Sequence, residues 1–61
     1  MTDDELAQAL DTKIAETEVA VGEANKNRRE AEMDASFWRS EEASLINRLE
    51  NYRIARKQFP F

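Results

Sequence analysis

Carboxylates are the side chains of this 61-residue chain most able to do chemistry, because it has 13 Asp and Glu but no His and no Cys. General acid-base catalysis and metal binding need such groups gathered in a shielded pocket. Glu41 and Glu42 are adjacent in sequence, so on a helix they point in different directions. The missing His and Cys exclude Cys/His zinc sites and the Glu-x-x-His pairs of a di-metal bundle. We therefore expect no enzyme, no metal, no cofactor and no small-molecule substrate.

Serines are the other candidate nucleophiles. Ser36, Ser40 and Ser44 repeat every four residues and would share one face of a helix. A serine nucleophile needs a neighbouring base to activate it, and no basic arrangement accompanies this repeat. We interpret the three serines as a narrow polar stripe.

Charge is segregated along the chain. Residues 1–25 carry seven acidic residues against one lysine, a net charge of -6, whereas from residue 48 onward four basic residues against one acidic residue give +3. Two such helices side by side attract each other when antiparallel. We therefore expect the basic end to meet the acidic third of a neighbouring chain. Because the whole chain has a net charge of -4, we do not expect it to bind nucleic acid. The basic residues are Arg48, Arg53, Arg56 and Lys57.

A helix is needed to position these groups. The strongest pattern in the chain is a series of positions spaced alternately three and four residues apart, which we call the seam. Eleven of its fifteen positions are apolar, against nine of the other thirty-five positions in the same span. Such heptad spacing is typical of a helix whose narrow stripe is covered by another helix. The seam consists of Leu10, Ile14, Thr17, Val21, Ala24, Arg28, Ala31, Ala35, Trp38, Glu42, Leu45, Leu49, Tyr52, Arg56 and Phe59.

Both ends of the helical region have sequence signals. Thr2 and Glu5 match a capping box, which predicts that a helix begins at residue 3. Pro60 cannot donate a backbone hydrogen bond and disfavours helical geometry at the residue before it. We therefore expect one helical, coiled-coil module over 1–61, of which 58–61 form a non-helical C-terminal tail.

Two all-α architectures remain open. One is a continuous helix from about 3 to 57 that forms an antiparallel coiled-coil dimer, and the unbroken phase of the seam favours it. The other is a helical hairpin with its turn at 22–27, where Gly22 resembles a helix C-cap and Asn27 an N-cap. Such a hairpin would dimerise into a four-helix bundle. We favour the long helix, because a turn at 22–27 would leave Leu49, Tyr52 and Phe59 uncovered.

Self-association is the predicted role of the apolar seam. Polar seam residues such as Arg28 and Glu42 commonly select helix register or oligomeric state. Arg28 and Glu42 either pair with groups on an opposing helix or extend their charged ends to water, and we favour the second. The predicted self-association residues are Leu10, Ile14, Val21, Ala24, Ala31, Ala35, Trp38, Leu45, Leu49 and Tyr52.

A second set of apolar residues lies off the seam. We expect Met33, Phe37, Ile46 and Ile54 to form a broken apolar edge that a two-stranded coil does not need to cover. Either the bundle has more than two helices, or this edge is a binding surface. The predicted partner-binding residues are Phe37, Ile46, Ile54, Phe59 and Phe61.

Size and composition set the class of function. A chain this short gains little stability from a single core and usually needs a disulfide, a metal or a partner. Its apolar runs are too short for a membrane span or a signal-peptide core, so we expect a soluble protein inside the cell. The predicted function is a non-catalytic interaction module that oligomerises through the seam to scaffold an assembly. The alternative is a small acidic regulatory or inhibitory protein, phage-type or chaperone-like, that clamps a larger protein and mimics the charge of nucleic acid.

Overall fold

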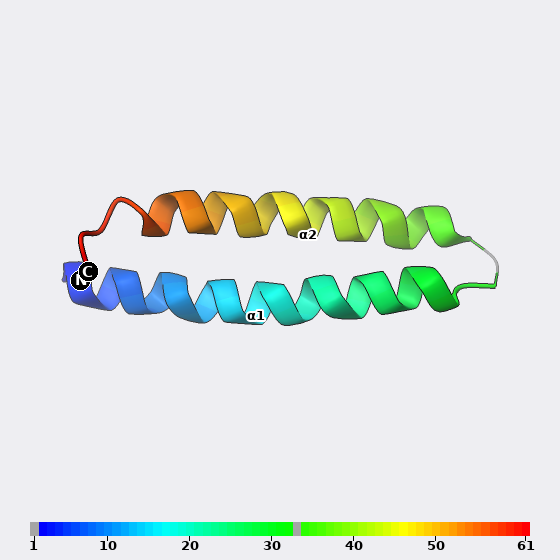
Figure 1. Cartoon of the computed structure of the whole chain (residues 1–61), viewed down its shortest axis with the longest axis horizontal. Helices are drawn as coiled ribbons and strands as arrows, with labels where there is room; N and C mark the ends of the chain where they lie inside the picture. Colours follow the sequence, from blue (N-terminus) through cyan, green and yellow to red (C-terminus); the bar gives the residue numbers. More distant parts are fainter. Residues whose placement is uncertain (1, 33) are drawn as a thin grey trace.

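The computed structural model describes residues 2–32 and 34–61, which form two helices, α1 (Asp3–Glu30) and α2 (Ala35–Arg56). The helices lie side by side and antiparallel, and both chain ends lie at the same end of the hairpin (Figure 1). The Cα positions span 46 × 16 × 14 Å. The predicted all-α class is confirmed.

Helix α1 begins where the capping signal places it. The hydroxyl of Thr2 accepts a hydrogen bond from the backbone N–H of Glu5 at 3.2 Å, and the Thr2 carbonyl accepts one from the N–H of Leu6 at 3.0 Å. The first turn is acidic and the last turn carries Arg28 and Arg29. Both ends therefore complement the helix dipole, with acid at the positive end and base at the negative end.

The chain is not one continuous helix, and its turn lies at 31–34 instead of 22–27. Gly22 lies inside α1, and no described residue has a positive φ. The low helix propensity of glycine and asparagine costs at most about 1 kcal/mol per residue, which packing along the hairpin outweighs. The helix ends instead at Glu30, the backbone of the following Ala31 is extended, and Asp34 occupies the N-cap position of α2. Met33 lies outside the described residues.

Helix length gives a reason for this turn. With the break at 31–34, α1 has 28 residues and α2 has 22, so α1 extends alongside the whole of α2 (Figure 1). Leu49, Tyr52 and Phe59 would lose this cover if the turn were at 22–27. The later turn thus places the C-terminal half of the seam against the N-terminal half.

Beyond Arg56 the chain turns back towards the start of α1 (Figure 1). The N–H groups of Lys57 and Gln58 donate to carbonyls of α2 at 3.1 and 3.2 Å, which satisfies acceptors that a helix end leaves free. The rings of Phe59 and Phe61 pack with their centroids 6.1 Å apart. The longer α1 provides the surface beside which this tail lies.

The hairpin has a thin core. Only Ala7, Ala24, Leu49 and Thr17 are buried among the described residues, and none of the large side chains there is completely covered. Thr17 satisfies its hydroxyl by donating to the Lys13 carbonyl at 2.6 Å. Neither described helix has an apolar stretch long enough to cross a membrane. Two helices alone therefore shield the seam only in part.

Candidate protein-interaction surface

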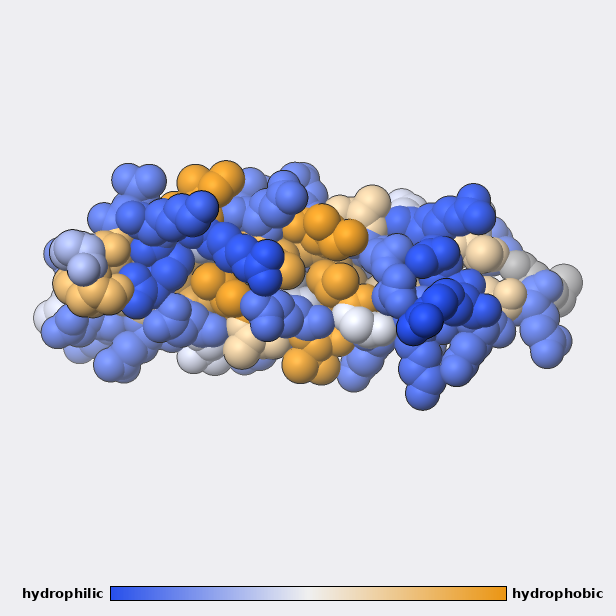
Figure 2. Space-filling view, in the orientation of Figure 1, coloured by the Kyte–Doolittle hydropathy of each residue, from blue (hydrophilic) through white to orange (hydrophobic). Residues whose placement is uncertain are grey.

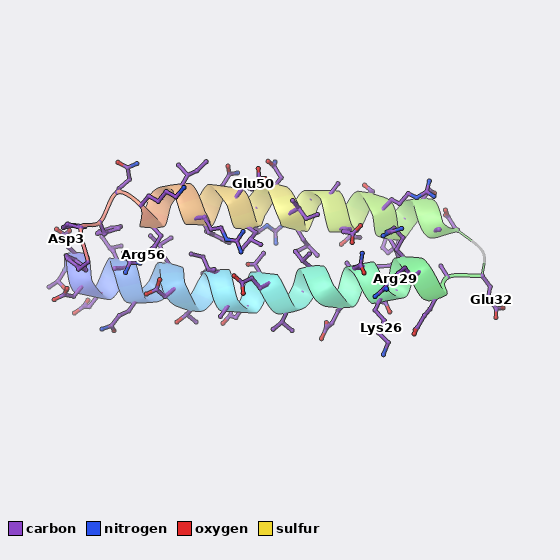
Figure 3. The ribbon with its side chains drawn as sticks, viewed as in Figure 1. Asp3, Lys26, Arg29, Glu32, Glu50 and Arg56 are labelled. Atoms are coloured by element: carbon purple, nitrogen blue, oxygen red, sulfur yellow. The ribbon has the colours of Figure 1, made fainter. Side chains whose placement is uncertain are left out.

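One flank of the hairpin is held by polar contacts between the helices. Asp11, Glu18 and Asn25 of α1 are spaced seven residues apart and so lie on one side of the helix. Arg56 Nε donates to Asp11 Oδ1 at 2.8 Å, and Arg53 Nη2 donates to Glu18 Oε1 at 3.0 Å. Figure 3 shows Arg56 between the two helices. We call the three α1 residues and the α2 residues that they bond the polar flank.

The third contact of the polar flank belongs to a small network near the turn. Asn25 Nδ2 donates to Glu42 Oε2 at 2.6 Å, and Arg28 Nε donates to Glu42 Oε1 at 3.0 Å. The side chains of Arg28 and Glu42 are 30% and 16% exposed. The hydrogen bond from Asn25, helped by the Arg28 charge, lowers the pKa of Glu42 below its ordinary value of 4.5. A partly shielded carboxylate is therefore kept ionised by two donors.

Two expectations about these charges are wrong. The basic end meets the acidic third of its own chain, because the hairpin makes the two segments antiparallel neighbours without a second chain. Arg28 and Glu42 do not simply extend to water; they pair with each other across the helices. Both corrections follow from the turn at 31–34, which brings these residues opposite one another.

The seam faces the interior of the hairpin along its whole length. None of its fifteen residues is exposed, whereas in the rest of the described span 10–59 only Ala20, Asn25, Asn27 and Ala55 are not exposed. Of the predicted self-association residues, Ala24 and Leu49 are buried. The others are half-buried: Leu10, Ile14, Val21, Ala31, Ala35, Trp38, Leu45 and Tyr52. Packing within one chain thus covers part of the surface that we assigned to self-association.

The flank opposite the polar one differs in composition. It consists of positions that are seven residues apart within each helix. These are Leu6, Lys13, Ala20 and Asn27 on α1, and Glu41, Arg48 and Ala55 on α2. Among the described residues, this flank makes no hydrogen bond or ion pair between the helices. We call it the open flank. Its half-buried members are Ala20, Asn27 and Ala55, and the two alanines are small, so they cover little of the edge of the seam on this side.

The predicted partner-binding residues do not form one edge. Phe37, Ile46 and Ile54 are exposed by 54%, 42% and 58%. Phe37 and Ile46 are two and a half helical turns apart and therefore lie on opposite sides of α2, and Ile54 lies on a third side. The Phe37 ring packs edge-on against Trp38, with centroids 5.0 Å apart. At the tail, Phe59 is half-buried and Phe61 is exposed.

Figure 2 shows hydrophobic side chains gathered in the middle part of the molecule, interrupted by hydrophilic ones, and further hydrophobic side chains at its outer edges. Because the half-buried seam is a narrow helical stripe, a partner helix fits it better than a flat protein surface does. This geometry resembles half of a helical bundle.

The groups considered for catalysis are not gathered together. Ser36, Ser40, Ser44 and Glu41 are exposed, and Ser36 donates a hydrogen bond to Asp34, which lowers the pKa of that carboxyl. No group of three acidic side chains suited to a metal ion occurs in the described part of the chain. A shallow depression near the end of α1 is lined by Lys26, Arg29 and Glu30, where Lys26 points away from α2 (Figure 3).

The polar flank is the feature that sequence reasoning missed. Its signal is the repeat of Asp11, Glu18 and Asn25 beside the seam, at the position where antiparallel helices commonly place interhelical polar pairs. We interpreted these charges only as a general attraction between helix ends. The repeat would have predicted which flank carries the pairs.

Comparison of the chain with family models, curated proteins and solved structures found no match.

Proposed function

We propose that this chain is a non-catalytic protein-protein interaction module that self-associates through its half-covered seam and so scaffolds an assembly. Two hairpins would pack into a four-helix bundle, in which each hairpin supplies the missing half of the other's core. The proposal rests mainly on the burial of the seam. None of its residues is exposed, yet only a few of them are fully buried.

Surface area supports this proposal. The hairpin exposes 4694 Å², whereas a folded monomer of 7.1 kDa typically exposes about 4,100 Å². The excess of about 600 Å² is similar to the roughly 800 Å² per partner that a standard-size interface buries. The radius of gyration, 14.2 Å, also exceeds the value of about 10.5 Å for a compact domain of this length.

The alternative, an acidic protein that clamps a larger partner, has less support. Its predicted contacts Phe37, Ile46 and Ile54 lie on different sides of α2, so no single surface presents them together. Arg53 and Arg56 neutralise two of the acidic residues that would imitate phosphates. We therefore propose only the self-associating module.

Sedimentation equilibrium over a range from about 1 to 500 μM tests the proposal. We expect a mass that rises towards at least twice 7.1 kDa. Leu45→Ala should weaken association because Leu45 lies in the seam, and Val19→Ala is the control because Val19 is 62% exposed on the outer side of α1. A folded chain that stays monomeric over the whole range would refute the proposed function.

A further inference from the structure

Five residues of α2 form a stripe along the open flank: Trp38, Glu41, Leu45, Arg48 and Tyr52. Their spacings of three, four, three and four residues keep them on one side of the helix. Trp38, Leu45 and Tyr52 are half-buried at the edge of the seam, whereas Glu41 and Arg48 are exposed beside it. We call this set the α2 stripe.

The α2 stripe reads almost the same in both directions. Leu45 is central, a charged residue follows on each side, and an aromatic residue lies seven positions away at each end. The two charges are opposite in sign. If a second copy is turned by 180° about an axis through Leu45, Trp38 lies opposite Tyr52, and Glu41 lies opposite Arg48. A two-fold interface requires this kind of self-complementary surface.

The charges of the α2 stripe are not used within the hairpin. Arg28, Glu42, Arg53 and Arg56 all pair between the helices, but neither Glu41 nor Arg48 forms an ion pair with any residue in the described parts of the chain. Among the described residues, the ion pairs between the helices thus leave out the open flank, where Glu41 and Arg48 carry opposite charges.

Small side chains lie on the same flank as the stripe. Ala20 and Ala55 are half-buried on the open flank, and small side chains at such positions let helices approach closely. The excess surface of the hairpin is similar in size to one standard interface, as worked out above. The small neighbouring side chains, the opposite charges and the excess surface area therefore all favour the same occupant of the stripe, a second copy of this chain.

Resting on the proposed self-association, we infer that two hairpins dock antiparallel through the α2 stripe, with Leu45 at the two-fold axis and Glu41 of each copy paired with Arg48 of the other. The polar flanks then remain on the outside of the four-helix bundle.

Charge reversal tests this arrangement. Glu41→Arg places two arginines opposite each other, and Arg48→Glu places two glutamates opposite each other. Because the two-fold axis applies each change twice, we expect either variant to raise the dissociation constant by about tenfold or more at low salt. Glu50→Arg is the control, since Glu50 is exposed and points away from α1 (Figure 3).

Mixing the two variants provides the decisive measurement. The Glu41→Arg chain should bind the Arg48→Glu chain at least as tightly as the wild type binds itself, because both ion pairs are then restored in the heterodimer. Loss of folding cannot produce that result. The chain carrying both substitutions should also recover self-association.

Trp38 is the only tryptophan and gives a second readout in the unaltered chain. Its emission should shift to shorter wavelength as concentration rises through the dissociation constant, because Tyr52 of the second copy covers it. If the wild type self-associates while neither reversal weakens it and the Trp38 emission stays constant, the α2 stripe is not the interface, although the proposed function stands. A wild type that stays monomeric would overturn both.

Discussion

Replacing Gly22 with alanine should stabilise the chain. Gly22 lies within α1, its φ is not positive, and a Cβ added there meets nothing within 4 Å. The substitution therefore gains helix propensity without strain, and glycine is about 0.8 to 1.0 kcal/mol less favourable than alanine in a helix interior. Part of this gain comes from the reduced freedom of the unfolded chain.

The size of the effect can be converted to a melting temperature. With an unfolding entropy of about 2.1 cal/mol/K per residue, 61 residues give about 130 cal/mol/K. A stabilisation of about 1 kcal/mol then raises Tm by roughly 8 °C.

Thermal unfolding followed by circular dichroism at 222 nm measures this shift. All variants must be compared at one protein concentration, since Tm depends on concentration in an associating system. Ala15→Gly is the matched control, because Ala15 is exposed within the same helix and should lose a similar amount. A lower Tm for Gly22→Ala would refute the reasoning, because it would mean that residue 22 needs a backbone or a close contact that only glycine permits, as a turn at 22–27 requires.

Three further predictions follow from the packing and the charges. Leu49→Ala should destabilise the fold by about 2 to 3 kcal/mol in urea unfolding, because Leu49 is only 7% exposed. If Leu45→Ala, at the half-buried Leu45, lowered the free energy of unfolding by as much or more at concentrations where the chain is monomeric, the packing described would be contradicted. A double-mutant cycle of Glu18→Ala and Arg53→Ala should give a coupling of only about 0.2 to 1 kcal/mol, since both side chains are half exposed; no coupling at low salt would argue against the pair. The lowered pKa of Glu42 contributes stability above pH 4.5 that is lost as pH falls through the folded-state pKa; Glu42→Gln should therefore flatten the Tm profile below pH 4.5, and an unchanged slope would exclude this contribution.

The sequence alone determined the helical class, the start of α1 and the residues that face the interior. Heptad spacing is a local property of a helix, so the seam can be read from residue order, and all fifteen seam positions avoid the exposed surface. The Thr2 cap is also local, because its hydrogen bond spans three residues.

Tertiary structure decided where the chain turns and which charges meet. Gly22, Asn25 and Asn27 carry the stronger local breaking signal, but local propensities differ by at most about 1 kcal/mol per residue. Closing the hairpin at 31–34 covers the C-terminal half of the seam and pairs Arg53 and Arg56 with α1. These gains depend on segments distant in sequence, and therefore only packing of the whole chain could select the turn.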